Sequence, residues 1–142
     1  MYTSDTIINN KKFNARNAVT FLAVTAFCGF FSSVYLSFSH GVSSPFMVYL
    51  ALIPFLLGVF PYSILYLLNA QAPQSVSKQL YNWGAITVLI GSLVKGIVEI
   101  SGYEATNIAV FGIELNYSLL YLSAGIILMF IGVSVYFKQR LK

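Results

Sequence analysis

Four long apolar stretches, separated by short polar segments, constrain this chain more than any other feature of its sequence. A helix needs about 20 apolar residues to cross the hydrocarbon core of a bilayer, and each stretch is that long. Only 8% of the 142 residues are charged, which is too few to cover the surface of a soluble domain. We therefore predict an all-α integral membrane protein, a single four-helix bundle over residues 1–142. The expected spans are about 18–38, 46–68, 80–100 and 117–137.

The basic residues fall on one side of these predicted spans. Of the 8 Lys and Arg residues, all except Lys95 precede the first span, lie between the second and third, or follow the fourth. The opposite connections, 39–45 and 101–116, contain no basic residue, and their only charged residues are Glu104 and Glu114. Because cytoplasmic loops carry an excess of Lys and Arg, we expect a multi-pass protein of the cell membrane with both termini in the cytoplasm.

Small residues predict where the helices touch, because lipid supplies no hydrophobic force between helices and close approach takes its place. We expect these faces to pack within the chain, and the alternatives are the interface of a homo-oligomer, such as a homodimer, or a path for a substrate. The residues concerned are Thr25, Gly29, Ser33 and Ser37 in the first span, Gly84, Gly91, Ser92 and Gly96 in the third, and Ser118, Gly125 and Gly132 in the fourth.

The connection 101–116 is too short to cross the membrane, yet from Ile108 to Ile113 it is too apolar to remain in solution. We expect it to form a short outer cap between the third and fourth spans. A strand pair that turns near Gly112 fits this segment, and so does an interfacial cap over the mouth of the bundle. The sequence leaves both conformations open.

The second span contains two prolines on nearly the same face, Pro54 and Pro61, with Gly58 between them. A proline removes a backbone hydrogen bond and clashes with the preceding turn, so two bends are expected. The bends either shape a curved helix around its neighbours or form a hinge whose freed carbonyls line a cavity. Tyr62 and Tyr66, one turn apart, would add hydroxyl groups to such a cavity.

Lys95 and Glu99 are the ionic residues inside a predicted span. Ionisable residues within a membrane are costly, so they are usually paired or functional. A spacing of four places both on one helical face, with Glu99 near the outer headgroups and Lys95 about 6 Å deeper. Three roles remain open for this pair: a structural ion pair that closes the outer end of the bundle, a contact to a ligand or ion, or a lipid-headgroup site.

Residues that carry enzymatic or metal chemistry are scarce in the sequence. Cys28 is the one cysteine and His40 the one histidine, so an internal disulfide is excluded and a metal site is not expected. The sequence contains no paired acids, phosphate-binding glycine loop or nucleophile motif. We therefore predict a protein without catalytic residues, metal or cofactor. The net charge of +4 comes from residues that flank apolar stretches, so membrane lipids, and not nucleic acid, are the expected partners.

Several motifs, taken in order along the chain, resemble one bacterial family. They are Ile53-Pro54-Phe55, Tyr62 and Tyr66-Leu67-Leu68 in the second span, the polar stretch 73–80, and Tyr136-Phe137-Lys138 at the end of the fourth span. This order is similar to the four-helix integral membrane proteins catalogued as domain of unknown function 2975. The resemblance implies a membrane protein that acts beside a small helix-turn-helix regulator in the cytoplasm.

Two functions follow from these observations. The first is a non-enzymatic membrane protein that acts by binding, as a sensor coupled to a cytoplasmic partner or as a protective factor. The second is a small transporter, or transporter subunit, for a lipophilic or cationic solute. In the transport hypothesis Lys95, Glu99 and the face from Pro54 to Pro61 line the path.

Overall fold

The computed structural model describes residues 4–102, 107–110 and 113–141. Three long helices dominate it: α1 (Ser4–Phe38), α5 (Ser75–Ile100) and α6 (Tyr117–Arg140). Each is long and apolar enough to cross a membrane. The prediction of a helical protein with long apolar helices is therefore confirmed for the first, third and fourth spans. Helices α1 and α5 begin before residues 18 and 80, because a helical backbone can continue from an apolar span into its polar flank.

The second predicted span, 46–68, is not one continuous helix. Bends were expected at its two prolines, and the structure has a break before Pro54 and a π-helical turn before Pro61. It is divided into α2 (Pro45–Val48), α3 (Leu52–Pro54), the π-helical turn η1 (Phe55–Val59) and α4 (Phe60–Leu67). The break between α2 and α3 lies in the turn before Pro54. This is where a proline acts, because its ring clashes with the carbonyl group four residues earlier and its nitrogen carries no hydrogen.

Side chains of neighbouring helices bond the carbonyl groups that these irregularities affect. At the end of α2, the Met47 carbonyl accepts a hydrogen bond of 2.6 Å from the Ser32 hydroxyl of α1. Further along, the Leu57 carbonyl accepts one of 2.8 Å from the Tyr81 hydroxyl of α5. An irregular backbone at membrane depth needs such partners, since no water is present there to replace them.

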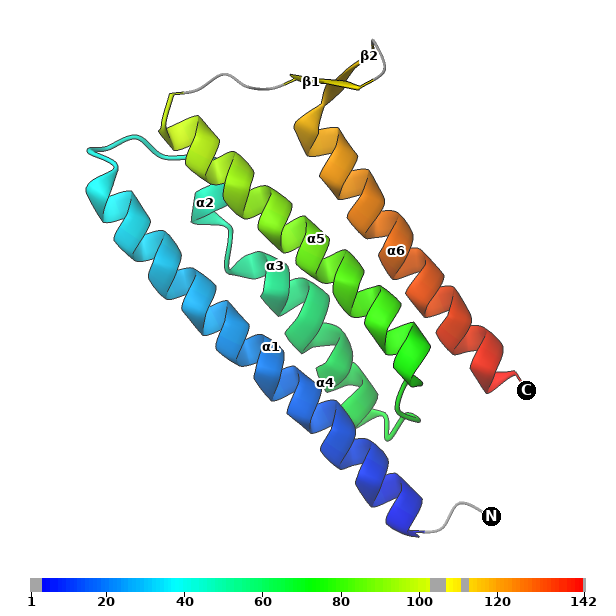
Figure 1. Cartoon of the computed structure of the whole chain (residues 1–142). Helices are drawn as coiled ribbons and strands as arrows, with labels where there is room; N and C mark the ends of the chain where they lie inside the picture. The colour runs from blue at the N-terminus through cyan, green and yellow to red at the C-terminus, as the bar shows by residue number, and fades with distance from the viewer. Residues whose placement is uncertain (1–3, 103–106, 111–112, 142) are drawn as a thin grey trace.

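The four segments lie side by side, and their order is visible in Figure 1. Helix α1 packs against η1 and α4, α5 packs against α2 and α3, and α6 packs mainly along α5. Both termini and the connection between α4 and α5 lie at one end of the molecule, which we call the basic end. The basic residues described there are Lys11, Lys12, Arg16, Lys78, Lys138 and Arg140.

Helices α5 and α6 meet along a seam of glycines. A Cβ atom on Gly84 would lie 2.6 Å from the Gly125 carbonyl oxygen, and one on Gly132 would lie 2.7 Å from the Tyr81 backbone nitrogen. The Gly91 backbone lies against the Tyr121 ring in the same way. The predicted contact faces of the third and fourth spans are therefore confirmed at these glycines, whereas the side chain of Ser118 lies outside the described residues.

The small-residue face predicted on the first span is only partly a contact face. Ser33 and Ser37 are exposed and bond to carbonyl groups of their own helix, and a Cβ atom on Gly29 would lie 3.7 Å from the Ala51 side chain. Among residues 7–38 of α1, whose side chains are described, the buried ones are instead Asn14, Cys28 and Ser32. The difference arises because these serine hydroxyls bond to the backbone of their own helix. They therefore need no partner on a neighbouring helix, and this face can stay exposed.

The connection between α4 and α5 is tied to both outer helices. Asn69, with a positive φ of 51°, ends α4, and the Ala70 N–H bonds back to the Leu65 carbonyl in the pattern of a Schellman motif. Asn14 of α1 donates to the Ala70 carbonyl, and the Tyr136 hydroxyl of α6 donates to the carbonyl of the next residue. This short connection therefore fixes the basic ends of α1, α4 and α6 relative to one another.

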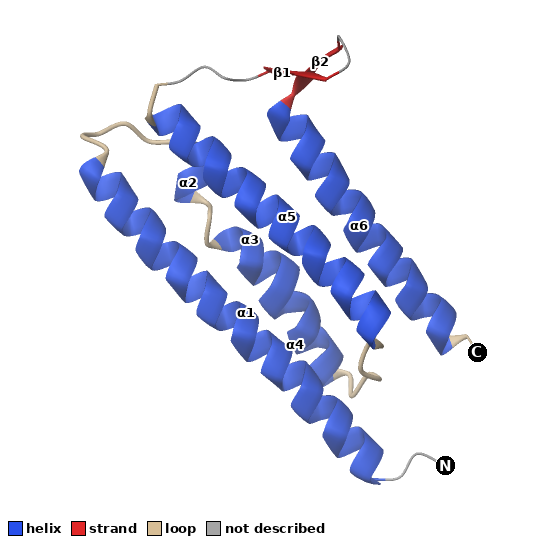
Figure 2. Ribbon diagram, in the orientation of Figure 1, coloured by secondary structure: helices blue, strands red, loops and turns tan. Residues whose placement is uncertain are grey.

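A short hairpin occupies the connection between α5 and α6 (Figure 2). Its strands, β1 (Asn107–Val110) and β2 (Ile113–Asn116), pair in antiparallel register, with Asn107 opposite Asn116. The strand pair is one of the two conformations expected for this segment. The predicted turn near Gly112 lies outside the described residues, as do the side chains of the strands, so the capping of the helices stays a prediction.

Candidate functional site

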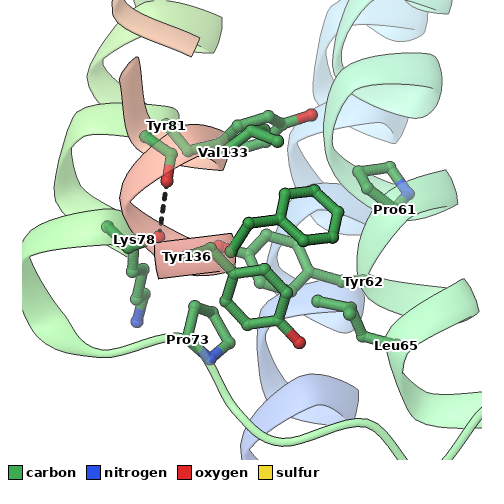
Figure 3. A pocket seen from close by; sticks show the side chains of 11 residues that line it. Pro61, Tyr62, Leu65, Pro73, Lys78, Tyr81, Val133 and Tyr136 are labelled. Carbon is green, nitrogen blue, oxygen red and sulfur yellow. Dashed lines mark hydrogen bonds between the residues drawn. The ribbon is translucent and has the colours of Figure 1, made fainter. Parts of the chain in front are cut away.

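Several pockets lie in the half of the molecule near the basic end, and two of them reach Pro54 or Pro61 of the second segment. The smaller one, of about 210 Å³, lies between α4, α5 and α6 (Figure 3). Pro61 and Tyr62 of α4, Tyr81 of α5 and Tyr136 of α6 are among its walls. The cavity separates α4 from α6. Residues of α5 and Pro73 of the α4–α5 connection complete its wall.

The larger cavity, of about 510 Å³, lies between α1 and α5 over Pro54 of α3. Near the basic end its walls carry Arg16 and Asn17 of α1 together with Lys78 and Asn82 of α5. Deeper in the molecule the walls become apolar. The lining residues there are Phe21, Val24, Ala85 and Leu89. The cavity is therefore polar and basic at one end and hydrocarbon-like at the other.

Lys78 borders both cavities. Its ammonium nitrogen lies 4.6 Å from the centre of the Phe13 ring of α1, which is within the range of a cation–π contact. This contact holds the aliphatic stem of a half-buried lysine across the gap between the two helices. The charge is thereby placed at the mouth of the larger cavity.

Tyr62 lines the smaller cavity and contacts two residues that line the larger one. Its hydroxyl donates a hydrogen bond of 3.0 Å to the Asn82 side-chain oxygen, and its ring stacks on Phe21 at a centroid distance of 5.8 Å. Phe21 in turn lies against the backbone of Gly58, where a Cβ atom would approach the ring to 2.1 Å. Because Asn82 uses its oxygen to accept from Tyr62, its NH₂ group is the half of the amide left to donate to a ligand.

The five residues predicted as a hinge or cavity face have separate positions. Pro54 lines the larger cavity, Pro61 and Tyr62 line the smaller one, and Gly58 is buried beneath Phe21. Tyr66 lines neither cavity and lies near Lys11, whose ammonium nitrogen is 5.8 Å from the ring centre. The expectation of one shared face therefore holds only in part, because the π-helical turn between the prolines changes the helical repeat.

Lys95 and Glu99 lie at the opposite end from the basic end. Their charged atoms are 3.7 Å apart, with the side chains 17% and 37% exposed. Glu99 also accepts a hydrogen bond of 2.5 Å from the hydroxyl of buried Ser44, and the Lys95 ammonium lies 5.0 Å from the Phe46 ring centre. The pair thus bonds to the start of α2, and neither residue lines the two cavities near the basic end.

The most informative residues of the larger cavity, Arg16, Lys78 and Asn82, were not identified from the sequence. The two cations were explained by membrane orientation alone, and their proximity depends on how α1 and α5 pack. Asn82 carried a usable signal, because an amide near the start of an apolar span requires hydrogen-bonding partners.

No protein-family model, no curated protein and no solved structure matches this chain. The resemblance to the four-helix family of unknown function therefore stays a prediction.

Proposed function

We propose that this chain is a non-enzymatic multi-pass membrane protein that acts by binding at its basic end and is coupled to a cytoplasmic partner. The observation that carries the proposal is the position of both cavities near the basic end, with Lys78 on the border of each. A ligand in either cavity would touch α5, and a ligand in the smaller cavity would also touch Pro73 of the loop that connects α5 to α4.

The membrane setting is supported by the side chains that the fold leaves exposed. Phe30 on α1 and Phe130 on α6 are each 70% exposed, and Leu67 on α4 is 74% exposed. A soluble monomer rarely exposes so many large apolar side chains on every helix, whereas lipid covers them at no cost. We propose that all four segments cross the membrane, with the irregular second segment held by the bonds from Ser32 and Tyr81.

The orientation in this proposal places the basic end in the cytoplasm. The two chain ends and the α4–α5 connection lie at this end, and each lies beside Lys or Arg residues. Segments that are rich in Lys and Arg are typically cytoplasmic. A partner would contact short segments, namely residues 4–17, 69–79 and 138–141. The α4–α5 connection could pass a conformational change from one helix to another, because it bonds to α1 through Asn14 and to α6 through Tyr136.

Extraction in a mild detergent followed by reconstitution tests this proposal. We expect a soluble partner to co-purify with the chain in a fixed ratio. The variant Gln79→Glu, which changes an exposed residue at the basic end, should lose this partner. The matched variant Ser43→Glu, on an exposed residue at the opposite end, should keep the partner. Solute uptake into vesicles of the purified chain, without a partner, would overturn the proposal in favour of transport.

The transport hypothesis has less support from the geometry. It requires Lys95 and Glu99 to line a path together with the proline-containing segment. Instead, Glu99 bonds to Ser44 at the far end, and neither charged residue lines the cavities at Pro54 and Pro61.

A further inference from the structure

We propose that the larger cavity between α1 and α5 is a binding site for an anionic phospholipid of the cytoplasmic leaflet. This inference rests on the proposed orientation and names the ligand class of the proposed binding function. A phospholipid has a phosphate group at one end and hydrocarbon at the other, and the cavity walls follow the same order.

The mouth of the cavity provides positive charge and hydrogen-bond donors. Arg16 and Lys78 face it from opposite helices, and the Asn82 NH₂ group lies one helical turn further in. A guanidinium is suited to bidentate recognition of phosphate, while an ammonium acts as a point charge. No acidic residue is among the lining residues, so a phosphate would meet no repulsive charge.

The cavity as a whole, with its basic mouth and its apolar inner walls, is about as long as one leaflet is thick. The lining runs from Phe13 to Val24 on α1 and from Lys78 to Leu89 on α5, a rise of about 16 Å on each helix. The hydrocarbon core of a bilayer is about 30 Å thick, so a channel of this length matches one leaflet. A volume of about 510 Å³ lies within the usual range of small-molecule pockets, roughly 300–1,000 Å³.

Among the residues that the structure describes, neither Arg16 nor Lys78 is held in an ion pair, so both cations can meet a ligand. Asn17 donates to the Phe13 carbonyl, and Thr20 donates to the Arg16 carbonyl, so both serve their own helix. The ion pair described in the structure involves Lys95 and Glu99, far from this mouth. Among the residues described, the partner of the Lys78 ammonium is an aromatic ring, which a phosphate can approach from the other side.

Trp83 allows this site to be tested directly, because it is the one tryptophan of the chain and follows Asn82 on α5. The full chain is reconstituted in phosphatidylcholine vesicles that contain increasing fractions of dibrominated phosphatidylglycerol, whose bromine atoms quench nearby tryptophan. Dibrominated phosphatidylcholine serves as the reference lipid. We expect a preference for phosphatidylglycerol of roughly thirtyfold, since the mouth carries two basic residues and each contributes on the order of 1 kcal/mol toward anionic lipid.

The decisive comparison uses two double variants with the same loss of charge at the basic end. Arg16→Gln with Lys78→Gln should abolish the preference, whereas Lys12→Gln with Lys138→Gln, at residues outside the cavity, should keep most of it. If the first double variant does not fold, the single variants should each show an intermediate preference, and Lys78→Arg should retain it.

Three results would overturn the site. They are equal quenching by both lipids, an equal loss of preference in the two double variants, and relief of quenching by soluble glycerol phosphate, which would identify a free phosphate compound as the ligand. The vesicles contain no cytoplasmic partner. A failure of partner binding therefore leaves this measurement unchanged, and a failure of lipid preference leaves the co-purification result unchanged.

Discussion

The Tyr81 hydroxyl donates a hydrogen bond of 2.8 Å to the Leu57 carbonyl, which lies four residues before Pro61. In a regular helix this carbonyl would accept from the N–H of residue 61, and proline has none. A side chain of α5 thus supplies the donor that the second segment lacks. Tyr81 also lines the smaller cavity, so this side chain links the bend of the second segment to that cavity's wall.

Replacement Tyr81→Phe should therefore destabilise the protein by about 1 kcal/mol, because the carbonyl loses its partner inside an apolar environment. Unfolding by sodium dodecyl sulfate in mixed micelles, followed by Trp83 fluorescence, measures this free energy. Tyr66→Phe is the matched control, since Tyr66 is 41% exposed and lines neither cavity. Equal stability of the two variants would show that the bond contributes nothing to the fold.

The space around Gly84 of the glycine seam and around Gly29 of α1 predicts different effects for the two Gly→Ala replacements. Gly84→Ala should destabilise the protein by roughly 1–3 kcal/mol, because its Cβ would lie 2.6 Å from the backbone oxygen of Gly125. Gly29→Ala should be neutral or stabilising by up to about 1 kcal/mol, since its Cβ would meet only the Ala51 side chain at 3.7 Å. The same mixed-micelle assay measures both, and a destabilised Gly29→Ala would contradict the packing of α1 against Ala51.

At the end opposite the basic end, Ser44→Ala should cost more stability than Lys95→Met. The serine hydroxyl donates to the Glu99 carboxylate and caps α2 by accepting from the Phe46 N–H, which together are worth about 2 kcal/mol. The Lys95–Glu99 pair, at 3.7 Å and partly exposed, is worth less than about 1 kcal/mol.

Ser43→Ala provides the matched control for this comparison, because Ser43 is the exposed neighbour of Ser44. Unfolding free energies of the three variants, taken in the same detergent, decide the order. If Lys95→Met proved the most damaging, the ammonium would have a structural role larger than the geometry gives it. If Lys95→Met folded normally but lost activity, a ligand site would be indicated.

The orientation of the chain predicts the result of topology reporters. Fusions at either terminus should report the cytoplasm, and a reporter inserted in the connection 101–116 should report the opposite side, because Lys and Arg residues are concentrated at the basic end. A cytoplasmic signal from that connection would overturn the orientation. It would also remove the cytoplasmic leaflet as the source of the proposed lipid.

Much of the fold could be predicted from local properties of the chain. Apolar length was enough to locate three helices, and glycines seven residues apart were enough to identify the face of α6 that meets α5 at Gly125 and Gly132. The prolines indicated that the second segment would be irregular. Its division into three short helices and a π-helical turn was not predicted, because the position of a break depends on which neighbouring side chains bond the affected carbonyls.

The candidate site was much less accessible to prediction. Membrane orientation was enough to explain the positions of Arg16 and Lys78 in the sequence, and Asn82 was not identified as a candidate residue. The importance of these residues comes from their meeting at one cavity mouth. Lys95 and Glu99 were selected because charge inside an apolar span is unusual, and they lie at the end that the sequence predicted, opposite the basic end, where Glu99 also bonds to Ser44.

By itself, the sequence determined which stretches are apolar enough to cross a membrane, on which side its charges lie, and which helix faces permit close approach. These are properties of spacing and composition, and they do not depend on the rest of the fold. Only the tertiary structure decided that Tyr81 meets Leu57, that Ser44 meets Glu99, and where the two cavities lie. The physical reason is that such contacts depend on the rotation and sliding of one helix against another. The packing of the whole chain sets this relative rotation and position of the helices, and helical periodicity alone does not determine them.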